Sequence, residues 1–158
     1  SDVCSSDLEL STFWMDGSLF AIESQQIYTA LEGQDVTQVI GCDEIYVGMI
    51  TWQNKTIPVA SLAKYFHHEI TYSKEFHRII VLKGSEGKPF GLVIDMVQDS
   101  PEIPLRCIDE TSQAMMGQHT LTKAIVKADI GQEKAEMLCI LDPLKIERYL
   151  MLEKGNIQ

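Results

Sequence analysis

The stretch YVGMITWQNKTIPVASL, residues 46–62, has the pattern of a β-hairpin with a proline in its second strand. Two runs rich in β-branched and aromatic residues flank Gln53 and Asn54, and asparagine readily takes the left-handed conformation that a two-residue turn requires. Pro58 has no N–H to give to a sheet, so we expect its strand to lie at an edge or to direct that position away from a partner. The stretch therefore predicts a hairpin rather than a catalytic loop or a ligand cradle.

Three further hairpins are predicted from runs of β-forming residues that are separated by turn residues. One of them joins RIIVL to GLVIDMV, two almost continuous apolar runs that we expect to be buried on both faces. No helical pattern lies between the strands to support a parallel sheet, so the spacing is typical of β-barrels and sandwiches. The three predicted connections lie at residues 16–17, 84–87 and 131–134.

The end of the chain has the pattern of an amphipathic helix, DPLKIERYLMLEK. Asp142 is expected at the N-cap and Pro143 at the first helical position, where its missing N–H costs nothing. Its apolar side chains are expected to dock on the sheets.

Charge and hydropathy exclude several classes of function. The chain of 158 residues has a formal net charge of −10, which argues against a nucleic-acid partner because a phosphate backbone requires a clustered basic face. No apolar run approaches the roughly 18 residues of a membrane-spanning helix. We therefore expect a cytoplasmic domain without direct membrane insertion, unless it is one piece of a longer, membrane-tethered protein.

The residues do not predict a metal site, a cofactor site or a catalytic site. The four cysteines lie far apart and lack the spacing of zinc ligands. His67, His68 and Glu69 are adjacent, and neighbouring residues on a strand point to opposite faces, so a solvated loop is favoured over a metal site. Asp95 stands alone in an apolar run, which favours a structural or turn-capping role over a general base. Trp52 is left with two interpretations, an aromatic residue at the edge of the core or an anchor for a partner.

Residues 1–8, SDVCSSDL, differ from the rest of the chain. They resemble the translated end of a sequencing-library adapter, so we expect either an artefact or a disordered tail and exclude them from the fold.

Four patterns in order now resemble one known family. FAIESQQI, GMITWQNKTIPVASL, GLVIDMV and CILDPLKI are similar to successive elements of the CheW-like domain, the bacterial chemotaxis coupling family, and the resemblance runs from about Thr12 to Leu150. It implies a mainly β fold of two SH3-like β-barrel lobes around a shared hydrophobic core, with a C-terminal α-helix. The CheW-like domain would span residues 9–152, followed by a tail at 153–158. Lobe one would be about 10–65 plus the C-terminal segment, and lobe two about 76–126.

The resemblance also implies a function. Such domains are non-enzymatic scaffolds that couple the cytoplasmic tip of a chemoreceptor to the regulatory domain of a histidine kinase, and they can join other CheW-like domains. The alternative is a degenerate structural module that supports a neighbouring domain of a longer signalling protein.

Site residues follow from the same resemblance, position by position. Gln53 stands where the family pattern has arginine, Thr29 where many members have an acid, and Ser61 where an aspartate is usual. A neutral amide cannot replace the charge-assisted bonds of a guanidinium, so a divergent contact chemistry is expected. The partner-binding residues would be Ile27, Thr29, Gly48, Trp52, Gln53 and Asn54, and the structural residues Pro58, Asp95 and Asp142.

Overall fold

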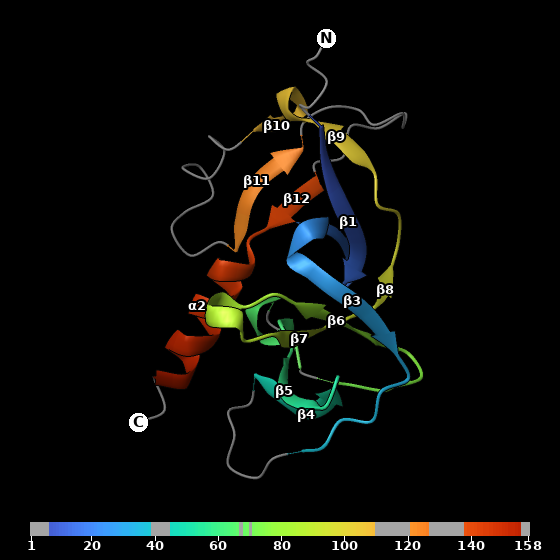
Figure 1. The fold of residues 1–158 in the computed structure, drawn as a ribbon, viewed down its shortest axis with the longest axis vertical. Coiled ribbons are helices and arrows are strands. Elements are labelled where there is room, and N and C mark those ends of the chain that lie inside the picture. Colours follow the sequence, from blue (N-terminus) through green and yellow to red (C-terminus); the bar gives the residue numbers. More distant parts are fainter. Residues whose placement is uncertain are drawn as a thin grey trace.

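The computed structural model describes residues 7–38, 45–66, 68–69, 71–109, 121–126 and 138–155, and the side chains of all of these except Asp109 and residues 151–155. They form two sheets and a C-terminal helix, α2 (Pro143–Gly155), which lies beside them (Figure 1). The prediction of a mainly β fold with a terminal helix is confirmed.

One sheet has seven strands and the other has five. The seven-stranded sheet has the order β10-β11-β12-β2-β1-β8, with β9 also paired to β1, and the five-stranded sheet has the order β3-β6-β7-β5-β4. The first comprises β1 (Asp7–Met15), β2 (Ser18–Glu23), β8 (Met96–Val97), β9 (Glu102–Pro104), β10 (Ile108–Asp109), β11 (Thr122–Val126) and β12 (Leu138–Leu141). The second comprises β3 (Ile27–Glu32), β4 (Tyr46–Trp52), β5 (Lys55–Ala60), β6 (Arg78–Leu82) and β7 (Phe90–Ile94). Four short 3-10 turns connect described strands: η1 (Ser24–Gln26), η2 (Ala63–Phe66), η3 (Ser85–Gly87) and η4 (Leu105–Cys107).

The predicted hairpins form antiparallel pairs. Asp16 and Gly17 connect β1 to β2, and Gln53 and Asn54 connect β4 to β5; all four residues have positive φ, from 49° to 81°. Two successive positive φ values are those of a type I′ turn, whose twist matches the flanking strands. β6 pairs with β7 around η3, and β11 pairs with β12, whose predicted loop at 131–134 lies outside the described residues.

Pro58 lies in an interior strand, and the geometry accommodates it. Met49, its partner in β4, exchanges both of its backbone hydrogen bonds with Thr37, so Met49 and Pro58 form a non-hydrogen-bonded pair. The nitrogen of Pro58 therefore points away from β4, and pairing of β5 with β7 begins only at Val59. Pro58 is thus directed away from a partner strand and does not lie in an edge strand, which was the other expectation.

The sheets divide the chain at places other than the predicted lobe boundaries. β1 and β2 lie in the seven-stranded sheet, whereas β3, β4 and β5 lie in the other, so the stretch 10–65 contributes to both. The stretch 76–126 is divided in the same way after β7. The chain changes sheet at η1 and again at Asp95, where polar residues interrupt two apolar runs. The local sequence pattern shows where a strand ends but not which sheet the next strand joins.

At the N-terminal end, Asp7 and Leu8 pair with β9, although residues 1–8 were expected to lie outside the fold.

The described residues form three hydrophobic clusters. One lies inside each sheet and the third lies between the sheets, where α2 contributes Ile146 and Leu150. β6 contributes Ile80 and Leu82 to the shared cluster and sends Ile79 and Val81 into the five-stranded sheet. The apolar run of β6 is thus buried on both faces, as predicted.

Helix α2 is fixed at its beginning and along its length. The backbone N–H of Leu144 donates to Oδ1 of Asp142 over 3.0 Å, which is the N-cap contact expected for this residue. The N–H of Ser85 donates to Oε1 of Glu147 over 2.9 Å and joins the helix to the η3 loop. Within the described residues, the helices lack the length and apolar character needed to cross a membrane.

Gly48 sits at an irregularity in β4. Its φ is 156°, and a Cβ at this position would lie closer to the carbonyl oxygen of Thr37 than van der Waals contact permits. Thr37 pairs with Met49 across this point, so the glycine allows the segment after β3 to lie directly on β4.

We expect Gly48→Ala to lower the free energy of unfolding by about 2 kcal/mol or more, because the new methyl group forces these backbones apart. Gly33→Ala is the matched control: Gly33 also has positive φ, 61°, but faces open space, so its cost should be about 1 kcal/mol. Denaturant unfolding of both variants measures the difference, and equal losses would contradict the steric argument.

Candidate partner-binding surface

The two edge strands of the five-stranded sheet meet because the sheet is strongly curved. β3 and β4 stand at opposite ends of the strand order, yet the rings of Tyr28 and Trp52 lie 5.2 Å apart between centroids. At the other end of the seam, Thr37 bridges to Met49. The aromatic pair therefore closes the barrel where its edges lack continuous backbone pairing.

The predicted contact residues occupy different environments. Gln53 and Asn54 are exposed at the hairpin turn, and Trp52 is half-buried against the cluster inside the five-stranded sheet. Both interpretations of Trp52 are thus compatible with its position at the edge of the core. Ile27 packs on the shared cluster, and Gly48 is buried beneath Val36 and Thr37. Thr29 is half-buried in β3.

Gly48 is buried in this arrangement, and its contact with a partner stays a prediction. Its small size and backbone conformation position the strand that carries Trp52.

Two residues that the sequence analysis did not select complete this surface. Tyr28 is 49% exposed, and Nζ of Lys83 lies 5.4 Å from the centroid of its ring. Exposure alternates along β3, with Ile27, Thr29 and Leu31 less exposed than Tyr28, Ala30 and Glu32. Because side chains of a strand point alternately to its two faces, this alternation in the sequence favours Tyr28 over Ile27 as the exposed residue of β3.

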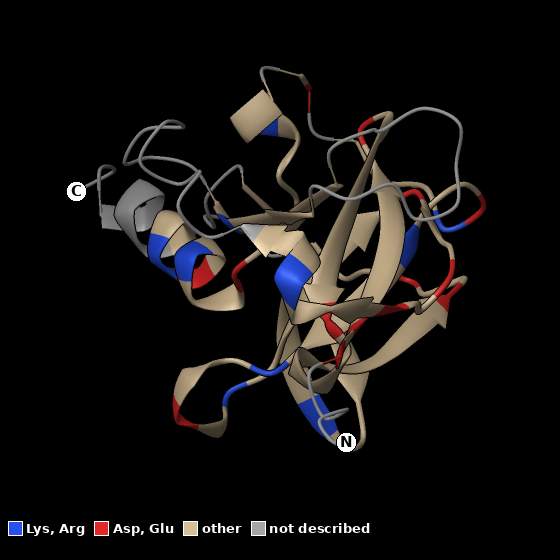
Figure 2. Ribbon diagram, turned by 90° about the horizontal axis from the view of Figure 1, so that it is seen from above, with Lys and Arg blue, Asp and Glu red and all other residues tan. Residues whose placement is uncertain are grey.

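Some basic side chains near the candidate surface are paired with a carboxylate and others are not. Lys74 bonds to Asp35 over 2.8 Å and Arg78 to Glu32 over 3.1 Å, whereas no ion pair is present for Lys55 or Lys83 among the residues with described side chains. Figure 2 shows basic segments spread over several described elements, with acidic segments between them.

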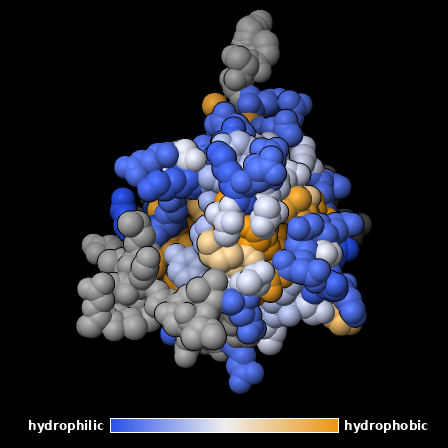
Figure 3. Space-filling view, turned by 60° about the horizontal axis from the view of Figure 1, so that its bottom comes forward, coloured by the Kyte–Doolittle hydropathy of each residue, from blue (hydrophilic) through white to orange (hydrophobic). Residues whose placement is uncertain are grey.

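Two hollows lie beside β4 and β5. One, of about 590 Å³, lies between β5, the η3 loop and α2, and its lining includes Pro58, Phe90 and Leu150. Figure 3, in which the bottom of Figure 1 comes forward, shows apolar residues in the middle of this face, framed by hydrophilic ones.

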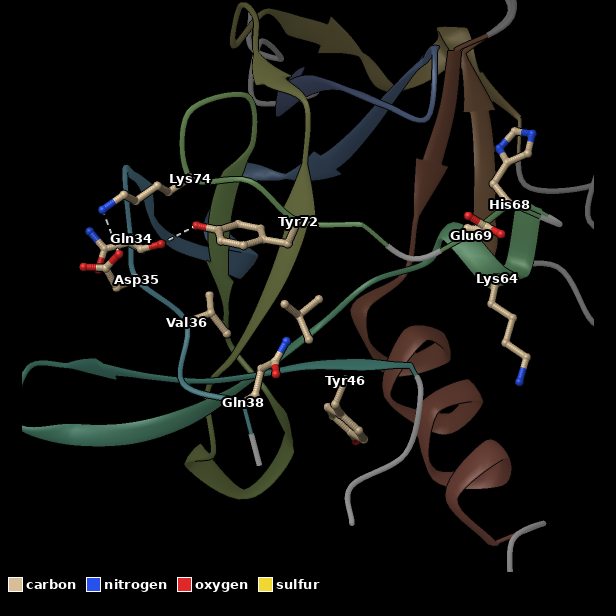
Figure 4. Close-up of a pocket in the computed structure, with 11 residues that line it drawn as sticks. Gln34, Asp35, Val36, Gln38, Tyr46, Lys64, His68, Glu69, Tyr72 and Lys74 are labelled. Atoms are coloured by element: carbon tan, nitrogen blue, oxygen red, sulfur yellow. Dashed lines mark hydrogen bonds and ion pairs between the residues drawn. The ribbon is translucent and has the colours of Figure 1, made fainter. Parts of the chain in front are cut away.

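The other hollow, of about 680 Å³, lies between the segment after β3, β4 and the residues around η2 (Figure 4). The hydroxyl of Tyr72 donates to the carbonyl oxygen of Gln34 over 2.5 Å at its wall. Burial raises the pKa of Tyr72, and the nearby Asp35 carboxylate acts in the same direction. The hydrogen bond to Asp35 raises the pKa of Lys74.

The described residues that line the two hollows do not form a recognisable catalytic arrangement. His68 lines the larger one, but its Nδ1 lies 2.7 Å from Oδ1 of Asp16 in the β1–β2 turn. His67, for which a solvated loop was favoured over a metal site, lies outside the described residues. The described residues contain no group of three or more side chains suited to a metal ion.

Asp95 makes contacts typical of a structural residue. Its N–H donates to the carbonyl oxygen of Trp14 over 2.7 Å, and its Oδ2 accepts the N–H of Gly17 over 3.4 Å. Nε2 of His77 is 4.0 Å from Oδ1 of Asp95, but neither residue lines the two hollows. These contacts join the point where the chain leaves β7 to the β1–β2 hairpin.

We expect the domain to lose stability at alkaline pH partly through Tyr72. Because the folded-state pKa is raised, the stabilising contribution is present below the unfolded value of about 10 and is lost as pH rises through the folded value. Tyr72→Phe should therefore show a smaller decrease in unfolding free energy between about pH 8 and about pH 11. Urea unfolding at both pH values measures it, and an unchanged decrease would contradict the expectation.

Comparison with known proteins agrees with this architecture. The model of the CheW-like domain family matches residues 9–149. The crystal structure of the scaffolding protein TtCheW from Thermoanaerobacter tengcongensis resembles this one with a TM-score of 0.73 and 20% sequence identity, over 86% of this chain and 89% of that chain. A search of curated proteins found no match. The likeness confirms the expected fold of two SH3-like lobes. With most of its length matched by the family model, the chain belongs to the CheW-like domain family.

Proposed function

We propose that this domain is a non-enzymatic adaptor that couples the cytoplasmic tip of a chemoreceptor to the regulatory domain of a histidine kinase. The observation that carries the proposal is the family match over residues 9–149. The structurally similar TtCheW is described as a scaffolding protein, which supports the same role. A cytoplasmic location fits this role.

The architecture suits an adaptor because its two sheets share one core. Phe13, Phe20, Leu82, Leu92 and Leu141 all belong to the cluster between them, so each sheet buries apolar surface against the other. Separating the sheets would expose these side chains to water, at roughly 1.5–3 kcal/mol for each large one. Surfaces on the two lobes are consequently held in a fixed relative orientation, which a bridge between two partners requires.

The proposed contact surface comprises the β4–β5 turn and the aromatic pair next to it. Gln53 and Asn54 are exposed to solvent, while Trp52 packs against the cluster that includes Ile50 and Ile57. Rigid aromatic residues of this kind are common anchors in protein interfaces. Ile27 and Thr29 precede and follow Tyr28 in β3, and we propose them as the margin of this surface.

The turn would bind a partner through neutral hydrogen bonds. Gln53 and Asn54 each carry an amide that donates and accepts, in place of a planar cation. Neutral hydrogen bonds are weaker than charge-assisted ones, so the affinity should depend more on the aromatic pair.

Isothermal titration with a receptor-tip fragment and with a kinase regulatory domain tests the proposal. We expect binding to at least one of them, and Trp52→Ala should weaken it about tenfold or more because an anchor is lost. Gln53→Ala, at an exposed turn position, should weaken it less and without loss of stability.

Leu105→Ala is the matched control, since Leu105 is 51% exposed but belongs to η4, beside the other sheet. It should leave the affinity unchanged. A folded domain that binds neither fragment would reject the adaptor role and favour a module that only supports a neighbouring domain.

A further inference from the structure

The surface around Tyr28 combines aromatic rings with lysines that have no carboxylate partner among the residues whose side chains the structure describes. Lys83 follows β6 and stands over the Tyr28 ring, while Lys55 pairs in register with Trp52 across the hairpin. We call Tyr28, Trp52, Lys55 and Lys83 the aromatic–lysine surface. It brings together β3, the β4–β5 hairpin and the end of β6, three segments that are distant in sequence.

The charge of Lys83 is positioned but not neutralised. When a lysine is paired with a carboxylate, as Lys74 is with Asp35, the two charges largely cancel and the pair attracts an anionic ligand only weakly. An aromatic ring attracts the ammonium group through its quadrupole and carries no net charge, so the full charge of Lys83 stays available. Holding the side chain in place before binding also reduces the conformational entropy lost when a partner docks.

We infer that the aromatic–lysine surface binds an acidic segment of a partner protein, in which a carboxylate lies next to an apolar side chain. This inference deepens the proposed function by naming the chemistry of a partner. It rests on the proposed function only because it takes this surface to be an interface. The apolar side chain would pack on the exposed part of Tyr28 and the edge of Trp52. The carboxylate would lie between the ammonium groups of Lys83 and Lys55.

Charge complementarity is the reason for choosing an acidic partner. The chain as a whole carries a formal net charge of −10, so an acidic segment is repelled by most of the molecule. Lys55 and Lys83, which have no carboxylate partner among the residues with described side chains, lie beside the exposed Tyr28 and the half-buried Trp52 and create a local exception. Such complementarity directs a partner to one place and orientation. A basic segment would instead meet like charges at this surface, with a cost in affinity.

A selection from a display library of random short peptides tests the inference without any receptor or kinase. We expect peptides selected on the domain to be enriched in Asp or Glu beside an aromatic or aliphatic residue. Their affinity should fall about tenfold or more in Lys83→Glu, and it should decrease with added salt. Arg106→Glu is the control, because Arg106 is an exposed cation on η4 and the substitution changes the net charge equally.

Tyr28→Ala should weaken the same peptides, and its thermal unfolding shows whether the fold is intact. Since the chain has two tryptophans, Trp14→Phe leaves Trp52 as the only indole, and the fluorescence of that indole should change on peptide binding. Selected peptides without acidic enrichment, an absence of selected peptides, or affinities unaffected by Lys83→Glu would each overturn the inference. None of these results depends on whether receptor-tip or kinase fragments bind, so failure of the inference and of the adaptor role can be distinguished.

Discussion

The burial of β6 and β7 on both faces is the constraint on which the rest of the structure depends. Ile79, Val81 and Val93 fill the five-stranded sheet, while Ile80 and Leu92 face the opposite sheet and α2. A strand of this kind cannot lie at a surface, so it requires apolar partners on each side. The second sheet, from strands before and after it in the chain, supplies one of them.

This constraint also explains how the candidate surface is built. Because β6 and β7 stand in the middle of the five-stranded sheet, β3 and β4 become its edges and must be brought together by curvature. Gly48 permits a close approach at one point, and the rings of Tyr28 and Trp52 meet at another. The aromatic pair thus stabilises the barrel and remains partly exposed to a partner, so fold and binding share the same side chains.

Local patterns predicted the elements well where the physical signal was local. Turn residues with positive φ, the Asp142 cap and the double-sided apolar run depend on neighbours in the sequence, and each was found as predicted. The distribution of the strands between the two sheets has no such local signal, because the chain changes sheet at η1 and at Asp95. Tyr28 and Lys83 were missed for a similar reason, since neither belongs to a recognisable motif and their proximity arises only when β3 lies beside β6.

The sequence by itself determined the family resemblance, the hairpins, the terminal helix and the position of Gln53 and Asn54 at a turn. These properties follow from short-range preferences of the backbone and from the alternation of apolar residues. Only the tertiary structure decided that Gly48 is buried and that Tyr28 joins Trp52 and Lys83 on one surface. The physical reason is that exposure and contact between distant strands depend on sheet curvature, which arises from packing around a core shared by both sheets.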